Sequence, residues 1–192
     1  MSAQAAEKTV SDHVNGVDVS RLRGTIDAVK AEPGIAKFNF RIGNKWINGG
    51  RNLSTVRDFH GALKDHPHEK PFELIADEPE VLLGDDRGPN PVEYLLTALA
   101  GCLTSSLVYH AAAKGIHLRG VESRLEGDLD LRGFLGISND VPVGYEQVRV
   151  YFKIDADISE EEKLELIEMA QAYSPVFNTV SKPTTVKVQL EP

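Results

Sequence analysis

The longest apolar pattern in the chain runs from Pro91 to Gly115 and predicts one long helix. Asn90 is a suitable N-cap, Pro91 suits the first helical position, and Glu93 stands where it can complete a capping box. Gly115 supplies the left-handed residue that commonly ends a helix. Because no residue between Glu93 and Lys114 is formally charged, we expect this helix to lie in a core with every side covered.

Large and small residues occupy different sides of this helix. The large apolar side chains recur at helical spacing and comprise Val92, Leu95, Leu96, Leu99, Leu103 and Leu107. A flank of small residues, where a second backbone can approach closely, comprises Ala98, Gly101, Cys102 and Ser105. A membrane span is the competing interpretation, since about 20 uncharged residues can cross a bilayer. We favour a core helix because Thr97, Ser106 and His110 interrupt the apolar run.

Alternation of apolar and polar residues predicts strands on both sides of the long helix. The predicted strands cover residues 38–42, 45–47, 51–59, 72–75, 121–131, 148–156 and 186–190. Gly43 and Asn44 offer a turn between the first two. Residues 64–70 are interpreted as a polar loop and residues 77–90 as an acidic loop. This order indicates an α+β fold, with mainly antiparallel sheets around a long buried central helix.

Helical spacing and capping residues predict three shorter helices, at residues 18–30, 159–172 and 174–180. Residues 1–17 are expected to be poorly ordered. We divide the chain into an N-terminal extension with a short helix, residues 1–35, and a single domain, residues 36–192. A chain of 192 residues does not readily cover every side of an uncharged helix. We therefore predict an obligate homodimer with the long helices near the shared interface.

Charge and composition exclude several classes of partner. The net charge is -8 and Lys and Arg do not cluster, so we expect neither nucleic acid nor a membrane surface as partner. The N-terminus lacks the apolar run of a secretory signal, which favours the cytoplasm. The sequence contains none of the common nucleotide, zinc or hydrolase motifs, and we expect no cofactor. His66 and His68 between Asp65 and Glu69 could touch a metal, but such histidines are more often solvated, so we expect no metal site.

The single cysteine is the main candidate for chemistry. A cysteine on an apolar helix most often serves as a small hydrophobe, and Cys102 fits that description. A nucleophilic thiol needs a nearby cation, and Arg51, after Gly49 and Gly50, is a plausible one. Glu93 lies about two and a half turns before Cys102, so its carboxylate cannot touch the sulfur within one helix. Glu93 either anchors an arginine or caps the helix.

Several segments resemble one protein family in the same order. The stretch GPNPVEYLLTALAGCL, followed by VYHAAAKGI, resembles the central-helix signature of the OsmC/Ohr family, the osmotically inducible and organic hydroperoxide resistance proteins. The GGR triplet at 49–51, ADEPEVLLGDDRGPNP, LEGDLDLRGFLG and YSPVFNTV resemble the family's other segments. The resemblance covers roughly residues 36–190, and it identifies residues 36–192 as a single OsmC-like domain.

The resemblance implies an intertwined α+β homodimer with two active sites at the subunit interface. It implies that a peroxidatic cysteine reduces organic hydroperoxides and that an arginine and a glutamate activate this cysteine. The cysteine matches Cys102 and the arginine matches Arg51. In the hydroperoxide-resistance branch that glutamate directly follows Asn-Pro, where this chain has Val92, and Glu93 comes one residue later. A shift of one position turns a helical side chain by about 100°, so the glutamate's role is either absent or filled differently.

A second difference concerns the resolving cysteine. Family peroxidases carry it before a proline, where this chain has Ser174 and Pro175. Any peroxidase cycle must therefore use one cysteine and an external thiol reductant. The alternative is a non-catalytic protein of the same fold that binds a small apolar ligand at the dimer interface, with Cys102 as packing. A hydrolase that uses Ser174 or a helix serine with His110 rests on residue types alone.

Overall fold

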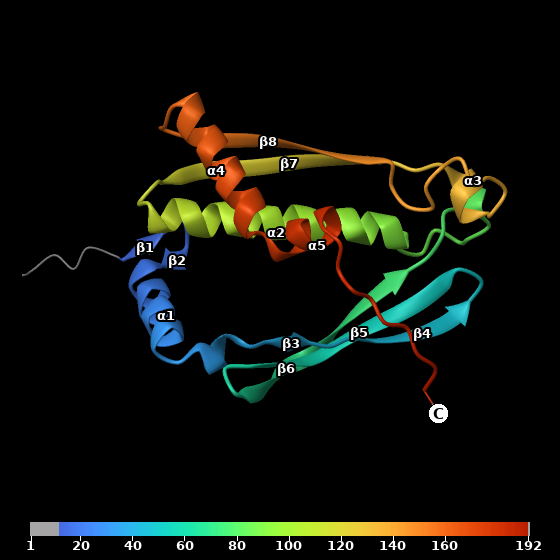
Figure 1. Ribbon diagram of the computed structural model, residues 1–192, viewed down its shortest axis with the longest axis horizontal. Helices are drawn as coiled ribbons and strands as arrows, with labels where there is room; N and C mark the ends of the chain where they lie inside the picture. The colour runs from blue at the N-terminus through green and yellow to red at the C-terminus, as the bar shows by residue number, and fades with distance from the viewer. Residues whose placement is uncertain (1–11, 192) are drawn as a thin grey trace, which may run out of the picture.

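Helix α2 (Pro91–Ala113) is the element on which the other layers are arranged (Figure 1). In the computed structural model, residues 12–191 are described, and they form three antiparallel sheets and five α-helices. The hairpin of β7 (Leu118–Asp128) and β8 (Gln147–Ala156) lies along one side of α2, and a four-stranded sheet lies on the other. Helix α4 (Glu160–Tyr173) crosses α2. The predicted α+β class with antiparallel sheets is confirmed.

Both ends of α2 follow the local signals in the sequence. The Asn90 side chain accepts a hydrogen bond from the Glu93 amide, and the Glu93 carboxylate accepts one from the Asn90 amide at 2.8 Å. Gly115 has a φ of 74°, the left-handed conformation that lets the chain leave the helix. The predicted capping box and the predicted stop are therefore confirmed.

The hydrophobic core lies between α2, the β7–β8 hairpin and α4. Its buried members are Leu99, Leu103, Leu107 and Ala111 of α2, Ile154 and Ala156 of β8, and Leu166 and Ala170 of α4. Helix α4 starts with a capping box between Ser159 and Glu162, and α5 (Pro175–Ser181) follows it directly. Of the predicted large apolar stripe of α2, Leu99, Leu103 and Leu107 are buried, whereas Leu95 near the start of the helix is 39% exposed.

Leu107→Ala is expected to lower the free energy of unfolding by about 2–5 kcal/mol, because it opens a cavity in this core. Leu107 has no exposed surface, so no solvent can fill the space left behind. In a chain of this length, each kcal/mol lowers the melting temperature by about 2–4 °C. Calorimetry measures the change. The matched control is Leu164→Ala on the exposed side of α4, and equal melting temperatures for both variants would contradict the assigned core.

The expectation that α2 is covered on every side is wrong for the single chain. Ala98, Gly101 and Ser105 are exposed, and a Cβ built on Gly101 would have no atom within 4 Å. Within residues 12–191, only the β1–β2 hairpin borders this flank, which stays open around Gly101. By length and composition α2 is also apolar enough to cross a membrane, with a mean hydropathy of 1.4. That signal is weak, since the core helix of a soluble protein passes the same test.

The central strand of the four-stranded sheet is β5 (Arg51–Gly61), which pairs with each of the other three strands. On one side, β4 (Gly43–Asn48) pairs with the first part of β5 and β3 (Asn39–Phe40) with its end. On the other side lies β6 (Lys64–Ala76). The predicted turn at Gly43–Asn44 is wrong. The chain reverses at Gly49, whose φ of 56° suits a tight turn, and Asn44 bonds instead to Asn52 and Ser54 on the facing strand.

The interpretation of residues 64–70 as a polar loop is also wrong, because they belong to β6. Two features conceal the strand. Pro67 and Pro71 cannot donate to a ladder, but β6 pairs on one side only, which tolerates proline. His66 and His68 act as aromatic members of the sheet, since the His66 ring stacks on Phe59 with centroids 4.8 Å apart.

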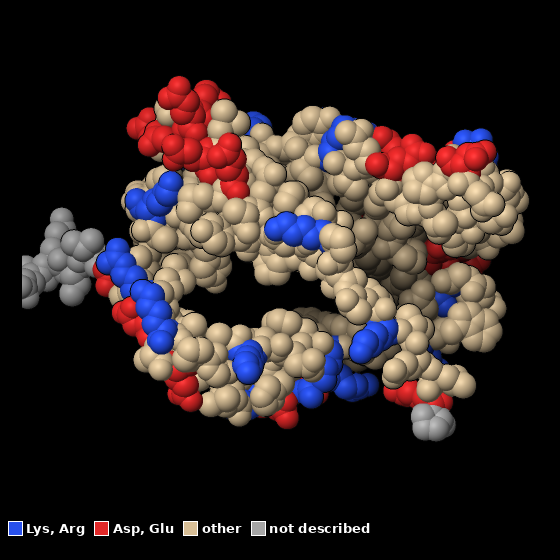
Figure 2. Space-filling view, viewed as in Figure 1, with Lys and Arg blue, Asp and Glu red and all other residues tan. Residues whose placement is uncertain are grey.

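One surface of this sheet is called here the aromatic face. Phe59 lies at its centre and contacts the rings of Phe38, Phe40, His66 and His68, and His68 contacts Phe72. Nearby ion pairs join Arg41 to Asp58 and Asp65. Among the described residues, no strand of this sheet packs broadly against a helix. Figure 2 shows an opening between the sheet and the layer that contains α2. A single chain therefore leaves much of the sheet without a packing partner.

The described N-terminal residues are ordered by a short hairpin, β1 (His13–Val14) with β2 (Val17–Asp18). The Asn15 amide donates to the Ile116 carbonyl at 2.8 Å, and its oxygen accepts from the Leu118 amide. The expected disorder is therefore wrong for residues 12–17, and for residues 1–11 it lies outside the described part. The predicted helix follows as α1 (Val19–Ala31), capped by Asp18, and a single 3-10 turn spans Pro33–Ala36.

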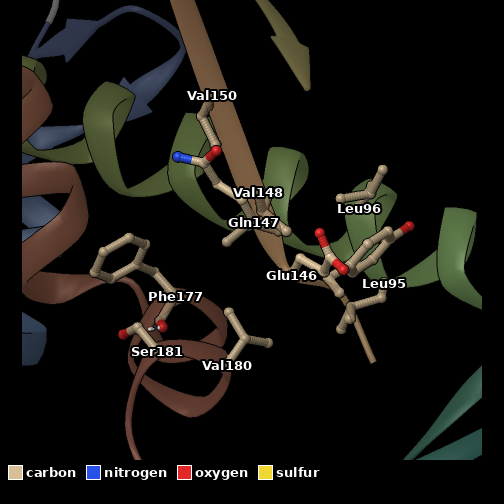
Figure 3. Close-up of a pocket in the computed structure, with 11 residues that line it drawn as sticks. Leu95, Leu96, Glu146, Gln147, Val148, Val150, Phe177, Val180 and Ser181 are labelled. Carbon is tan, nitrogen blue, oxygen red and sulfur yellow. Dashed lines mark hydrogen bonds between the residues drawn. The ribbon is translucent and has the colours of Figure 1, made fainter. Parts of the chain in front are cut away.

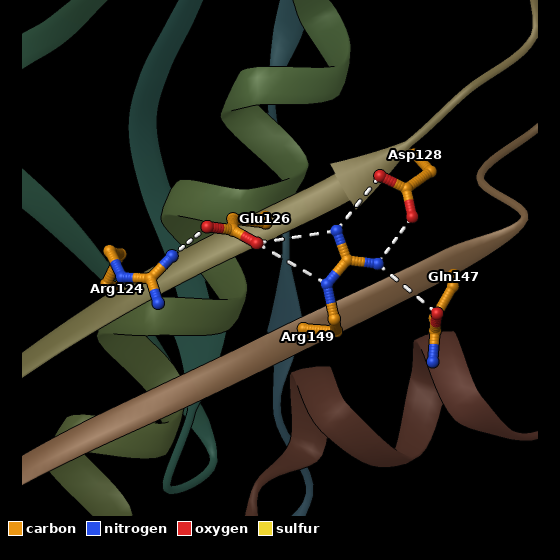
Figure 4. Close-up of polar contacts among 5 residues, drawn as sticks. All are labelled: Arg124, Glu126, Asp128, Gln147 and Arg149. Carbon is orange, nitrogen blue, oxygen red and sulfur yellow. Dashed lines mark hydrogen bonds and ion pairs between the residues drawn. The ribbon is translucent and has the colours of Figure 1, made fainter.

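Charged residues fix the register of β7 against β8 (Figure 4). Arg149 on β8 reaches both Glu126 and Asp128 on β7, and Arg124 pairs with Glu126. Glu126 stands directly opposite Arg149 in the ladder, so a slip by one residue would break these contacts. The hydrogen bonds to Arg149 lower the pKa of Asp128 below its ordinary value.

The predicted last strand, residues 186–190, is absent from the described structure. Val186, Val188 and Leu190 are 79%, 91% and 97% exposed. Their alternation needs a pairing strand and an apolar surface, and within residues 12–191 this segment pairs with no strand. The connection between β7 and β8 contains the short helix α3 (Leu131–Phe134), and the loop before α2 contains a 3-10 turn, η2 (Glu80–Leu82).

Candidate functional site

Cys102 lies near the middle of α2, at the edge of its small-residue flank. Its side chain is half-buried, and the thiol forms no disulfide. Leu99, one turn earlier, enters the core, whereas neighbouring Gly101 faces open space. Cys102 therefore stands at the border between the core of one chain and a surface that a second molecule can approach.

Arg51 is the first residue of β5, directly after the Gly49–Gly50 turn. Its side chain is 26% exposed, and its Nη1 lies 3.5 Å from Oδ2 of Asp85 in the loop before α2. Within residues 12–191, no ion pair joins Arg51 to Glu93 and no polar contact joins it to Cys102. The structure thus gives Arg51 a carboxylate partner that the sequence did not predict.

Glu93 is engaged at the N-terminus of α2. Its carboxylate accepts a hydrogen bond from the Asn90 amide. Its charge also lies near Tyr145, whose hydroxyl donates to the Val92 carbonyl at 3.0 Å. Burial raises the pKa of Tyr145, and the nearby Glu93 carboxylate raises it further. The helix-capping role is confirmed. A catalytic role for Glu93 stays a prediction.

Ser174 is fully buried and caps α5, since its hydroxyl accepts a hydrogen bond from the Phe177 amide at 3.1 Å. Its neighbour Tyr173 accepts a bond from Ser106, at 3.4 Å. Ser106 lies one helical turn after Cys102 on α2. The segment that leads into Ser174 therefore contacts α2 one helical turn beyond Cys102.

No serine–histidine pair forms among the described residues. His110 contacts the Tyr173 ring, with centroids 4.8 Å apart. Ser106 donates to a backbone carbonyl and Ser174 accepts from a backbone amide. The residues considered for a hydrolase are therefore engaged in helix packing and capping.

An apolar cavity of about 380 Å³ opens between α2, β8 and α5 (Figure 3). Its apolar walls are Leu95, Leu96 and Leu99 of α2, Val148 and Val150 of β8, and Phe177 and Val180 of α5. Leu99 precedes Cys102 by three residues, which places the cavity within one helical turn of the thiol along α2. The sequence could not reveal this cavity because it depends on where α5 docks.

Comparisons with known proteins agree on one family. The family model for OsmC-like protein matches residues 84–189, more than half of the chain. Among curated proteins, none is significantly similar.

Solved structures of similar fold include an OsmC-like protein from Mycoplasma pneumoniae, at 19% identity and a TM-score of 0.59, covering 74% of this chain and 87% of the other. An organic hydroperoxide resistance protein OsmC from Legionella pneumophila matches at 18% identity and a TM-score of 0.52, covering 73% and 89%. An OsmC-like protein of unknown function from Vibrio cholerae matches at 11% identity and 0.56, covering 73% and 92%. With its long central helix, antiparallel sheets and family match, this chain belongs to the OsmC-like protein family.

Proposed function

We propose that the protein is a homodimeric, one-cysteine thiol peroxidase that reduces organic hydroperoxides. The observation that carries this proposal is the position of Cys102: the only cysteine of an OsmC-like chain lies half-buried on the central helix, three residues after Leu99, which lines an apolar cavity. The Legionella relative of the same fold is described as an organic hydroperoxide resistance protein. Arg51 is the proposed cation that favours the thiolate.

The proposed cycle has one oxidising step and two reducing steps. The Cys102 thiolate attacks one peroxide oxygen, the O–O bond breaks, and the leaving alkoxide takes a proton to become an alcohol. The cysteine is now a sulfenic acid. One external thiol condenses with it and releases water, and a second attacks the mixed disulfide to restore Cys102. Because Cys102 is the only cysteine, both reducing equivalents must come from outside the chain.

A second copy of the chain is part of this proposal. The aromatic face, the open flank around Gly101 and the exposed C-terminal residues are all apolar surfaces that one chain leaves uncovered. Monomeric proteins rarely expose such areas. In a homodimer, an Arg51 from either chain can approach Cys102 across the shared interface, which the single chain does not achieve by a direct contact.

Brief exposure to stoichiometric cumene hydroperoxide is expected to oxidise Cys102, because a partly exposed thiolate beside a cation is the reactive form. Intact-mass spectrometry with a sulfenic-acid trap measures the product, and Cys102→Ser is expected to lose both trapping and hydroperoxide consumption. Hydroperoxide consumption that survives unchanged in Cys102→Ser would contradict the mechanism.

A non-catalytic role in binding a small apolar ligand is the second candidate. The cavity between α2, β8 and α5 favours it, since an apolar pocket of about 380 Å³ can enclose a small molecule. Native mass spectrometry of the purified protein tests this role. A bound lipid-like molecule together with a thiol inert to hydroperoxide would support binding over catalysis.

A further inference from the structure

We infer that Asp85 positions Arg51 for Cys102, in place of the glutamate that the family resemblance would put at Val92. This inference rests on the proposed function, since it assigns a residue to the same site. It starts from the ion pair between Arg51 Nη1 and Asp85 Oδ2, at 3.5 Å. The neighbouring acid Glu93 is already engaged by the Asn90 amide.

The loop holds the backbone around Asp85 in place, while the Asp85 side chain is 65% exposed and reaches Arg51. On one side of Asp85, the Gly84 amide donates to the Pro79 carbonyl at 3.2 Å, and on the other the Asp86 amide donates to the Glu78 carbonyl at 3.1 Å. A Cβ on Gly84 would come within 1.8 Å of that Glu78 carbonyl oxygen, so the backbone is tightly packed here.

A buried carboxylate organises the rest of the loop. Asp77 is only 2% exposed, and its two oxygens accept the Glu78 amide at 2.9 Å and the Arg87 amide at 3.2 Å. The Asp77 amide donates to the Pro89 carbonyl. These bonds join the two ends of the loop, so the segment that carries Asp85 is a braced structure rather than a free connection.

The same loop, which follows β6 in the chain, contacts both the turn before β5 and the start of α2. A Cβ on Gly50 would lie 2.8 Å from the Glu78 side chain, so the turn before Arg51 packs directly on the loop. The Asn90 side chain, which caps α2, contacts the Glu78 carboxylate at 3.5 Å. The loop therefore contacts both the turn before Arg51 and the first turn of the helix that carries Cys102, and it also contains Asp85.

This arrangement suits a positioning role. A guanidinium has five donors in a fixed plane, and the ion pair with Asp85 is made through Nη1. The other donors stay available for a thiolate or a peroxide oxygen. A carboxylate on the braced loop limits the conformations of a long side chain that would otherwise lose entropy on reaching the site.

The test measures the rate of Cys102 alkylation by iodoacetamide as a function of pH, in the full-length protein. Four variants are compared with wild type: Asp85→Asn, Asp85→Glu, Arg51→Met and Asp86→Asn. Asp86 is the matched control, because it is an exposed neighbour with the same carboxylate, and its left-handed φ of 53° is one that asparagine tolerates. Circular dichroism confirms that each variant is folded.

We expect the alkylation midpoint to rise in Asp85→Asn, in the same direction as in Arg51→Met, while Asp86→Asn overlays wild type. A rise of one pH unit corresponds to about a tenfold lower thiolate fraction below the midpoint. Asp85→Glu, which keeps the charge, is expected to return the midpoint toward wild type.

The direction in which the alkylation midpoint shifts distinguishes a positioning role of Asp85 from a purely electrostatic effect of its charge. If Asp85 acted only through its charge, its removal would lower the midpoint, because a negative neighbour disfavours the thiolate. A lowered or unchanged midpoint in Asp85→Asn, or an unchanged midpoint in Arg51→Met, would overturn the inference. Alkylation needs no hydroperoxide, so a wild-type thiol inert to cumene hydroperoxide would contradict the proposed function while leaving this test decisive.

Discussion

Phe40→Asp is expected to convert the proposed dimer into monomers at low micromolar concentration. Phe40 is 75% exposed in the single chain, where its ring stacks beside Phe59 on the aromatic face. If a second copy covers this face, the substitution removes apolar contact and buries a carboxylate. Losing the burial of one phenylalanine costs about 1.5–3 kcal/mol, which weakens association by about 10- to 150-fold, and the buried charge adds to this.

Sedimentation equilibrium of wild type and variant measures the effect. Val81→Asp is the control, because Val81 is equally accessible at 85% exposure but lies on the 3-10 turn η2, away from the aromatic face. A single chain that functions alone would tolerate both substitutions, since both sites already face solvent. A Phe40→Asp variant that remains as dimeric as wild type would refute the role of the aromatic face.

Ser174→Cys is expected to change the chemistry of the cycle from one cysteine to two. The family resemblance places the resolving cysteine at this position, and Ser106, one turn after Cys102, contacts the carbonyl of the preceding Tyr173. The new thiol would condense with the sulfenic acid of Cys102 and form a disulfide with loss of water. After one equivalent of cumene hydroperoxide, the variant should have lost two hydrogens in mass, whereas wild type gains one oxygen.

Ser174→Ala is the matched control for this substitution. It removes the α5 cap, which costs about 1 kcal/mol, without adding a thiol, so it separates loss of the cap from gain of the disulfide. Persistent trapping of a sulfenic acid in Ser174→Cys, at the wild-type level, would show that residue 174 cannot reach Cys102 in this protein.

The elements with strong local signals could be predicted from the sequence. Helices α2 and α4 begin with capping boxes that the pairs Asn90–Glu93 and Ser159–Glu162 specify on their own. The alternation of charged and apolar residues along β7 likewise determines which face of the strand is exposed to solvent. In these cases the residues that decide the structure lie within a few positions of one another, so no knowledge of the tertiary fold is needed.

The elements that depend on distant partners could not be predicted. Strand β6 contains prolines and histidines, which in the sequence alone predict a loop. The strand forms because it pairs with β5, on which Phe59 provides a surface for the His66 ring. The ion pair of Arg51 with Asp85 spans a turn, two strands and a loop. For the site, the sequence and the family resemblance selected Cys102 and Arg51, but only the folded loop reveals Asp85.

The opening between the sheet and the α2 layer bears on how much active protein a cell obtains from each chain that it synthesises. If a second copy fills that opening, the sheet has no lasting support until two chains meet. Newly made chains at low abundance would then spend longer with the aromatic face uncovered, where proteases and chaperones can act. The yield of folded protein would rise more steeply than the rate of synthesis, so that a modest induction produces a disproportionate gain in capacity.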